Sequence, residues 1–340
     1  MIALAPSRRI GSTTLTLPPF GFGAAHLGEL YARVPEAESL KTLNAAWEAG
    51  VRYFDTAPWY GRGLSEHRLG GFLRTKPRNE FQITTKAGRI LHRPADPSNF
   101  DRAPWIGGLN FEVQFDYTSD GIMRSYEQAL QRLALDTVDA LLIHDLDAWT
   151  HGDKEGFYAA QLAASGFRAM EALKASGDVK AIGMGINTNQ GLENVAPRYD
   201  LDFCLVAMPY TLLDQASLHR GMADLARRGT SVIIGAPFAS GILVTGSTGP
   251  AHYAYGKASP EIQAKVLAME AICAAHQVAL PAAALHFVLA HPNVVSVIPG
   301  ASKASEVVQN LASLQLPIPA DFWSDLMMQG LIDADAPVPA

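Results

Sequence analysis

Eight short apolar segments alternate with amphipathic helical patterns along this chain of 340 residues. The first segment, PFGFGAA, precedes a helical pattern over 36–49 that stops at Gly50. The other seven lie at 51–54, 81–85, 138–143, 179–184, 203–207, 232–235 and 294–298. Eight strands that alternate with helices are typical of the (β/α)8 barrel, whereas a doubly wound open sheet uses fewer strands. The pattern therefore predicts an α/β fold, a TIM barrel that occupies 1–340 as one domain.

Three segments stand outside this alternation. Residues 8–17 form two short β-prone pieces around a turn, which predicts an N-terminal hairpin capping one end of the barrel. Residues 88–118 and 243–259 are connections much longer than the usual βα loop. Because both follow the carboxyl end of a strand, we expect both to overhang the same mouth, where loops commonly carry function.

Composition excludes several classes of function. Hydrophobic residues make up 48% of the chain and charged residues 18%, with a formal net charge of -6 and no concentrated basic patch. This balance argues against nucleic acid as a partner. No apolar run approaches the ~20 residues of a membrane helix, and Arg8 and Arg9 follow the first apolar residues, unlike the order in a signal peptide. We expect a cytoplasmic protein with no membrane partner, a monomer or small homo-oligomer.

Cysteine and histidine usage predicts no metal site. The two cysteines, Cys204 and Cys273, could form a disulfide, but two buried thiols in a reducing compartment are favoured. The chain has no CxxC and no HExxH, and the histidines of HFVLAH have the wrong spacing and no glutamate between them.

Four polar residues follow three successive strands of the predicted sheet. Asp55 and Tyr60 come after the strand at 51–54, Lys86 ends FQITTK, and His144 ends VDALLIH. The carboxyl ends of parallel strands are where such sheets bind ligands. A phenol with a pKa near ~10 needs a neighbouring cation to work at neutral pH, and a buried lysine needs a carboxylate. Taken singly, each residue has an ordinary structural interpretation as a cap, a core aromatic or a solvated charge.

In this order and context the segments resemble the aldo-keto reductase family. The resemblance covers nearly the whole chain, through GFGAAHLG, DTAPWYGRGLSEHRLG, TTKAG, LLIHDLD, GMGIN, GAPFASGIL and VIPGASKASEVVQNL. It implies that Tyr60 is the general acid/base, that Lys86 and Asp55 tune it, and that His144 orients the substrate. It also implies a nicotinamide cofactor, because no side chain carries hydride.

The cofactor would bind without a Rossmann fingerprint, since GFGAAH and GMGINT both lack the third glycine. By resemblance, Asn187 would contact the nicotinamide carboxamide and Tyr210 would stack on the ring. Ala207 stands where relatives often carry a glutamine. Further contacts implied by the resemblance are Gly23, Ser240, Gly241, Leu243, Gly300, Ser302, Lys303, Glu306 and Asn310.

The choice between NAD and NADP is expected to depend on the C-terminal segment VIPGASKASEVVQNL. Many NADPH-using relatives place a lysine where Gly300 stands and an arginine where Glu306 stands. A carboxylate would repel a ribose 2′-phosphate but could accept hydrogen bonds from two free ribose hydroxyls. The resemblance therefore favours NAD, with NADP possible because Ser302 and Lys303 are near.

The substrate expected by resemblance is a cyclic hemiacetal. FDYTSDGIMRSYEQALQRLALDTVDALLIHDLD and MPYTLLDQ look most like the branch that oxidises aldoses such as L-fucose, or pyridoxal, to lactones. Aromatic walls suit both a sugar and a pyridine ring. The expected pocket residues are His26, Trp59, Trp105, Phe111, Trp149 and Tyr253.

Other functions remain open at this stage. The chain could act on pyridoxal alone, or be a general aldehyde or ketone reductase. A catalytically silent nucleotide-sensing scaffold is disfavoured by the four residues. An unrelated barrel hydrolase or lyase would need a metal or paired carboxylates, and Asp55 has no convincing second acid.

Overall fold

Eight parallel strands form the centre of the molecule. The computed structural model describes residues 6–249, 252–254 and 256–339. The strands pair in the order β14-β11-β10-β9-β8-β5-β4-β3, and bridges from Phe20 to Val297 and from Gly23 to Gly300 join the two edges into a barrel. The TIM-barrel prediction is confirmed. The strands are β3 Phe22–Gly23, β4 Tyr53–Asp55, β5 Gln82–Ala87, β8 Ala140–His144, β9 Ala181–Ile186, β10 Phe203–Val206, β11 Ser231–Ile234 and β14 Val294–Val297.

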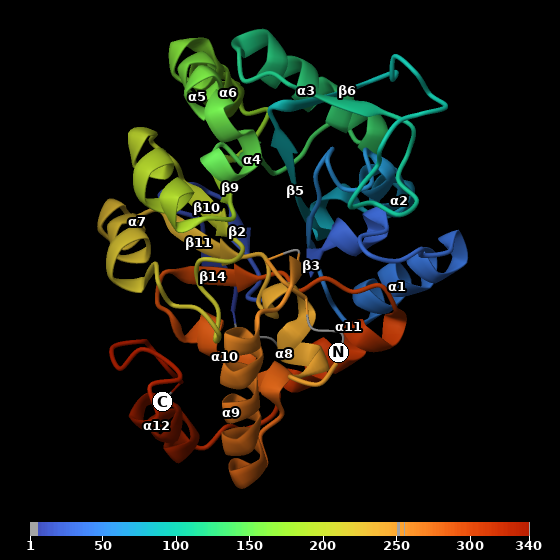
Figure 1. Cartoon of the computed structure of the whole chain (residues 1–340). Helices are drawn as coiled ribbons and strands as arrows, with labels where there is room; N and C mark the ends of the chain where they lie inside the picture. The colour runs from blue at the N-terminus through green and yellow to red at the C-terminus, as the bar shows by residue number, and fades with distance from the viewer. Residues whose placement is uncertain (1–5, 250–251, 255, 340) are drawn as a thin grey trace.

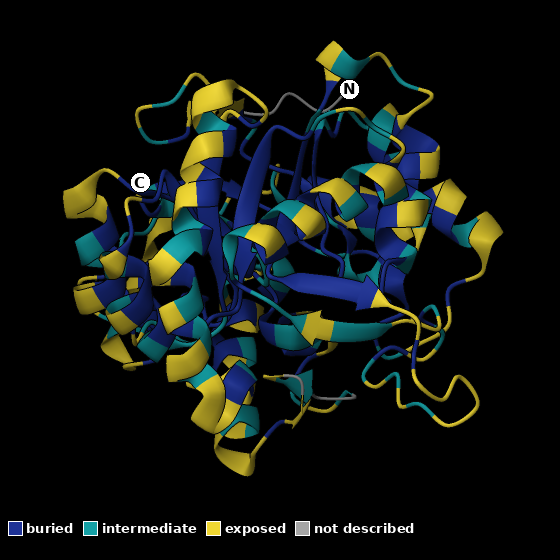
Figure 2. Cartoon of the chain, turned by 90° about the horizontal axis from the view of Figure 1, so that it is seen from above, coloured by how far each residue is buried: buried dark blue, intermediate teal, exposed yellow. Residues whose placement is uncertain are grey.

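Helices surround the strands, as Figure 1 shows. The helix expected over 36–49 is α1, which spans Glu36–Glu48. In Figure 2 the strands are buried, while the helices turn exposed residues outward and buried ones toward the sheet. The other helices are α2 Leu64–Leu73, α3 Ser119–Leu133, α4 Ala148–His151, α5 Glu155–Gln161, α6 Phe167–Ser176, α7 Ala223–Arg228, α8 Ile242–Thr245, α9 Pro260–His276, α10 Leu280–Ala290, α11 Ala304–Ser313 and α12 Ala320–Met328.

The N-terminal hairpin closes the amino end of the barrel, as the sequence predicts. Strands β1 (Arg8–Arg9) and β2 (Thr16–Leu17) pair antiparallel. The hairpin residues Ile10 and Leu15 pack with Leu142, Phe203 and other inward-facing strand residues in one buried cluster. Side chains of the described residues fill this end, and the cavity lies at the opposite mouth.

Both long connections lie at the mouth and contain hairpins that the sequence pattern did not reveal. The first holds β6 (Arg89–His92) and β7 (Glu112–Phe115), paired antiparallel. The second holds α8 and the antiparallel pair β12 (His252–Tyr253) and β13 (Gly256–Lys257). Trp105 in the first connection bridges to Leu30, so this connection covers the strand ends next to β3.

The remaining expectations concern thiols and membranes. Cys204 and Cys273 are both buried and unpaired, as expected. Among the described residues no single helix is both long and apolar enough to cross a membrane; α9 and α10 pass the test only together, with a bend of 98° between them. The residues before Pro6, on which the signal-peptide expectation partly rests, lie outside the described chain.

Candidate active site

Asp55, Tyr60 and Lys86 form one hydrogen-bonded group at the carboxyl end of the barrel. Lys86 Nζ donates to Asp55 Oδ2 at 2.7 Å, to the Thr56 carbonyl at 2.9 Å and to Tyr60 Oη at 3.2 Å. Thr84 Oγ1 donates to Asp55 Oδ1 at 2.7 Å. Asp55 ends β4 and pairs with Thr84 across the sheet, so the parallel register brings these side chains together. The lysine charge is thus shared between a carboxylate and a phenol.

His144 completes the expected group from the next strand of the barrel. It ends β8, and its ring lies edge-on to Tyr60 with 6.0 Å between the ring centroids. Its backbone carbonyl accepts a hydrogen bond of 2.7 Å from the hydroxyl of Tyr117. Nδ1 of His144 is buried without a partner among the described residues. The imidazole therefore lies beside the phenol, and the hydrogen bond from Tyr117 holds its backbone.

Burial sets the protonation states of this group. It lowers the pKa of His144 well below 6.5, and the cations Arg89 and Lys86 lower it further, so the ring is neutral at physiological pH. Burial also raises the pKa of Tyr60 well above its ordinary value, Asp55 and Asp145 raise it further, and Arg89 opposes them. The sequence analysis expected Lys86 to lower this pKa, but the net direction is upward, with burial as its largest cause. Tyr60 therefore rests protonated.

Arg89 and Asp145 form a second buried ion pair in contact with the first group, and the sequence analysis missed both. Arg89 Nη2 donates to Asp145 Oδ2 at 2.8 Å, and His144 Nε2 lies 3.3 Å from the same oxygen. Arg89 also stands 5.1 Å over the ring of Trp59. Arg89 comes three residues after Lys86, and Asp145 directly follows His144. This closeness in sequence was the only signal that they belong to the site, and a charged residue at such a position is ordinarily solvated.

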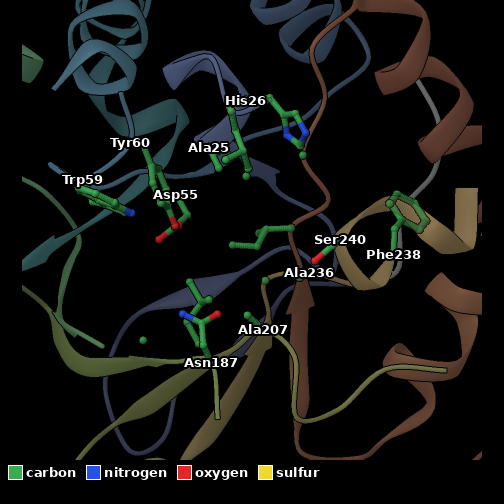
Figure 3. Close-up of a pocket in the computed structure, with 18 of the residues that line it drawn as sticks. Ala25, His26, Asp55, Trp59, Tyr60, Asn187, Ala207, Ala236, Phe238 and Ser240 are labelled. Carbon is green, nitrogen blue, oxygen red and sulfur yellow. The ribbon is translucent and has the colours of Figure 1, made fainter. Parts of the chain in front are cut away.

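A cavity of about 720 Å³ opens over these residues, and most of the expected site residues line it. In Figure 3, Asp55, Tyr60 and Trp59 lie on one side of it, with Asn187 and Ala207 on another wall. Ala236, Pro237 and Phe238 also line the cavity; they belong to the expected segment GAPFASGIL, although the sequence analysis did not name them singly. The expected lining residues are Gly23, His26, Asp55, Trp59, Tyr60, Lys86, Trp105, His144, Trp149, Asn187, Ser240, Gly241, Gly300, Ser302, Glu306 and Asn310.

Five expected residues do not line this cavity. Phe111 borders a separate groove with Leu91 of β6, and the Tyr253 hydroxyl donates to Asp214. Tyr210 is fully buried and stacks on Phe287 of α10, with 5.4 Å between the ring centroids, so its ring packs in the core. Leu243 is likewise fully buried. Lys303 is exposed at the start of α11.

At the far end of the cavity, Glu306 satisfies the start of its own helix. Its Oε2 accepts hydrogen bonds from the Ser302 amide at 2.7 Å, from Ser302 Oγ at 3.1 Å and from the Lys303 amide at 3.3 Å. His26, expected at the substrate, lies at this end instead, since a Cβ added at Gly300 would stand 2.4 Å from its Nδ1. Figure 3 shows His26 apart from Tyr60.

The cavity fits a nicotinamide dinucleotide. It extends from Lys86 and Tyr60 to Asn310 on α11, which suits a long ligand. Asn187 Oδ1 is buried without a partner among the described residues, and its Nδ2 already donates to Asp145 Oδ1 at 2.8 Å. An unpaired buried acceptor carries a cost that a carboxamide NH₂ of a ligand would remove.

Comparison with known proteins decides the family. The family model described as Aldo/keto reductase family matches residues 19–328. The chain belongs to the aldo-keto reductase family. It is therefore an NAD(P)-dependent oxidoreductase, and small-molecule carbonyl substrates fit this family.

Two relatives match this aldo-keto reductase over nearly their full length. A pyridoxal 4-dehydrogenase of Microbacterium luteolum is 39% identical over 334 residues, covering 96% of this chain and 97% of the relative. A D-threo-aldose 1-dehydrogenase of a Pseudomonas species is 39% identical over 330 residues, covering 94% and 95%. The aldo-keto reductase AKR11C1 of Bacillus halodurans, solved in a holo form, shares the fold with a TM-score of 0.71 at 21% identity, over 97% of both chains.

Proposed function

We propose that this aldo-keto reductase oxidises a cyclic hemiacetal, of an aldose or of pyridoxal, to the lactone. The observation that carries the proposal is the hydrogen-bonded group of Asp55, Lys86 and Tyr60 facing His144 inside the cavity. The relatives that are 39% identical support the substrate class, since one is a pyridoxal and the other an aldose dehydrogenase.

In this proposal Tyr60 moves the proton. Tyr60 must first lose its own proton to solvent; its phenolate Oη then takes the proton of the anomeric hydroxyl, and Lys86 Nζ, 3.2 Å away, stabilises the phenolate charge. Neutral His144 donates a hydrogen bond to the reacting oxygen and holds it in place. A nicotinamide bound in the cavity would accept the hydride from the anomeric carbon. In the reverse direction Tyr60 would protonate a carbonyl, which is why a general aldehyde or ketone reductase is the second candidate.

The walls beside the proposed reacting centre suit a flat or ring-shaped substrate. Trp59 and Trp105 stand edge-on with 5.6 Å between their ring centroids, and Tyr60 lies 5.8 Å from Trp105. Trp149 lines the cavity with a half-exposed side chain. Aromatic rings suit both the apolar face of a sugar and the face of a pyridine. We therefore keep both substrates in the proposal.

The first test is the appearance of reduced nicotinamide when the purified protein receives NAD with pyridoxal, L-fucose or D-arabinose. We expect turnover of at least one of these hemiacetals. Turnover of pyridoxal alone would assign the protein to vitamin B6 oxidation, and turnover of the sugars would place it with the aldose 1-dehydrogenases. If none is oxidised while simple aldehydes are reduced, the hemiacetal proposal is wrong and the second candidate replaces it.

We further propose that NAD is preferred over NADP. The Glu306 carboxylate accepts hydrogen bonds from the amides of Ser302 and Lys303, which directly precede α11, so its negative charge lies where an anion near this helix end would bind. Two unit charges 4 Å apart repel by about 4 kcal/mol at an effective dielectric constant of about 20. A Cβ at position 300 would stand 2.4 Å from Nδ1 of His26, so a lysine there would require the His26 ring to move. The protein therefore opposes a 2′-phosphate by the charge of Glu306, and it lacks the lysine of NADPH-using relatives.

The cofactor preference is measured as the ratio of kcat/KM with NAD to that with NADP. We expect wild-type protein to favour NAD by roughly tenfold or more. Glu306→Gln should lower this ratio by about tenfold, because water and salt already screen part of the repulsion between the carboxylate and the 2′-phosphate. Glu171→Gln, an exposed carboxylate on α6, serves as the control and should leave the ratio unchanged. A wild-type preference for NADP would refute the proposal.

A further inference from the structure

Asp145 holds a backbone conformation that side chains other than glycine rarely adopt. Its φ is 41°, in the left-handed region, directly after His144. Such a conformation persists only where the surroundings enforce it, and it is concentrated at functional sites. Here the Asp145 amide donates to the Gly185 carbonyl at 3.2 Å, and the Tyr117 hydroxyl holds the preceding carbonyl. The surrounding structure thus holds Asp145 in an uncommon backbone conformation that directs its carboxylate inward.

The carboxylate of Asp145 contacts three residues of the cavity. Oδ2 accepts from Arg89 Nη2 at 2.8 Å and lies 3.3 Å from His144 Nε2, while Oδ1 accepts from Asn187 Nδ2 at 2.8 Å. Asp145 and Arg89 are both almost completely buried. A buried carboxylate needs such a cation to stay ionised, so Arg89 keeps the charge in place.

The first consequence concerns the amide of Asn187. Because Nδ2 donates to the carboxylate, Oδ1 is the atom left without a partner, and it lies on a residue of the cavity wall. A flipped amide would set its oxygen against the Asp145 oxygen, two acceptors in contact with no proton between them. Asp145 therefore fixes the acceptor as the atom that Asn187 offers to a ligand.

The second consequence concerns the imidazole of His144. A carboxylate 3.3 Å from Nε2 favours the tautomer with the proton on that nitrogen, since a lone pair there would face a negative charge. Arg89 and Lys86 oppose a second proton on the ring. The neutral ring would then carry its single N–H on Nε2, and this is the N–H that His144 can offer to the reacting oxygen, since Nδ1 is buried without a partner among the described residues.

We propose that Asp145, held by Arg89, is a positioning residue that fixes the amide of Asn187 and the tautomer of His144 for the reaction. The inference rests on the proposed function, since it assigns these two residues to the cofactor and the reacting oxygen. It adds the buried ion pair of Arg89 and Asp145 to the four expected residues. This pair transfers neither the proton nor the hydride.

The test compares Asp145→Asn with a matched control on the same strand. Asp139, directly before the first residue of β8, is also buried and accepts from Arg78 Nη2 and Lys180 Nζ, each at 2.8 Å, and from a backbone amide. Asp139→Asn removes a comparable buried charge far from the cavity. Both variants should lose stability. Only Asp145→Asn should lower kcat, by about 10²-fold, as expected when reacting groups are misplaced by about 1 Å.

A second measurement does not depend on turnover. Nitrogen-15 spectra of histidine-labelled protein, recorded without ligand, report which ring nitrogen of His144 carries the proton, and the signal is assigned by its loss in His144→Asn. We expect the Nε2–H tautomer in wild-type protein and in Asp139→Asn, and a mixture of tautomers in Asp145→Asn. This readout stands even if no hemiacetal is oxidised, so failure of the proposed function and failure of this inference are separate results.

The arginine supplies a test if Asp145→Asn does not fold. Arg89→Met should lower kcat by about tenfold or more and change the His144 spectrum, whereas Arg89→Lys, which keeps the charge, should restore most of both. A folded Asp145→Asn or Arg89→Met variant with wild-type kcat and an unchanged His144 tautomer would overturn the proposal. So would an equal loss of kcat in Asp139→Asn, which would make the effect one of general stability.

Discussion

Replacing Tyr60 with phenylalanine is expected to lower kcat for hemiacetal oxidation by about 10²- to 10⁴-fold, the usual contribution of a positioned acid or base. The phenyl ring would keep its packing, including the Trp105 contact at 5.8 Å and the Lys86 ammonium 4.7 Å from the ring centre. It would lose only the oxygen that takes the proton. Affinity for NAD should therefore change little.

Steady-state kinetics and the quenching of tryptophan fluorescence by NAD measure the two quantities separately. Tyr126→Phe is the matched control, because this buried tyrosine on α3 donates to the Asp178 carbonyl at 3.5 Å and does not line the cavity. It should keep wild-type kcat. Unaltered turnover in Tyr60→Phe would exclude the proposed proton transfer and, with it, the assigned chemistry.

The pH profile gives an independent view of the same role. Burial and two carboxylates keep the pKa of Tyr60 above its ordinary value, so the fraction able to accept a proton grows as the pH rises. The pKa of His144 lies well below 6.5, so its charge is constant over this range. Oxidation by the wild-type protein should therefore accelerate from pH 6 to pH 10, and this rise should vanish in Tyr60→Phe.

The four proposed catalytic residues were predictable because parallel strands align their ends. Gly23 pairs with Asp55, Asp55 pairs with Thr84, and His144 pairs with Gly185. A polar residue at the end of each apolar segment thus had to meet the others at one mouth. The barrel itself followed from the same alternation, since closure needs only the bridges between the first and last strands.

What the sequence did not reveal depends on backbone features without a local signature. Arg89 begins a hairpin whose partner strand starts at Glu112, so its burial depends on a distant segment. Asp145 turns inward through a left-handed φ, which stays uncommon for aspartate although aspartate adopts it more often than most residues, so the sequence alone does not predict it. Tyr210 was expected at the ring of the cofactor but packs against Phe287. Its hydroxyl is buried without a partner among the described residues, and nothing in the sequence indicates this position.

Replacing Lys86 with methionine should abolish oxidation and also destabilise the fold. The side chains of Lys86 and Asp55 are each 2% exposed, so the variant leaves a buried carboxylate without its cation. Breaking a buried pair by removing one partner costs about 3–5 kcal/mol in the free energy of unfolding. Chemical denaturation of wild-type and variant protein at pH 7 measures the difference, and Lys41→Met, whose lysine is largely exposed, is the control.

The loss of stability in Lys86→Met should depend on pH and on the carboxylate of Asp55. Burial raises the pKa of Asp55, and without Lys86 this rise is unopposed by the nearest cation, so the folded state binds a proton that the unfolded state releases. The penalty therefore grows as pH rises above the ordinary pKa of Asp55 and shrinks as pH falls from 7 toward 4.

Adding Asp55→Asn to Lys86→Met separates stability from chemistry. The asparagine oxygen can still accept from Thr84 Oγ1, and no charge remains buried, so most of the lost stability should return at pH 7. Activity should stay absent, because no cation would remain at 3.2 Å from Tyr60 Oη. A stable double variant that still oxidises hemiacetals would show that Arg89, the other cation acting on Tyr60, supplies the charge instead.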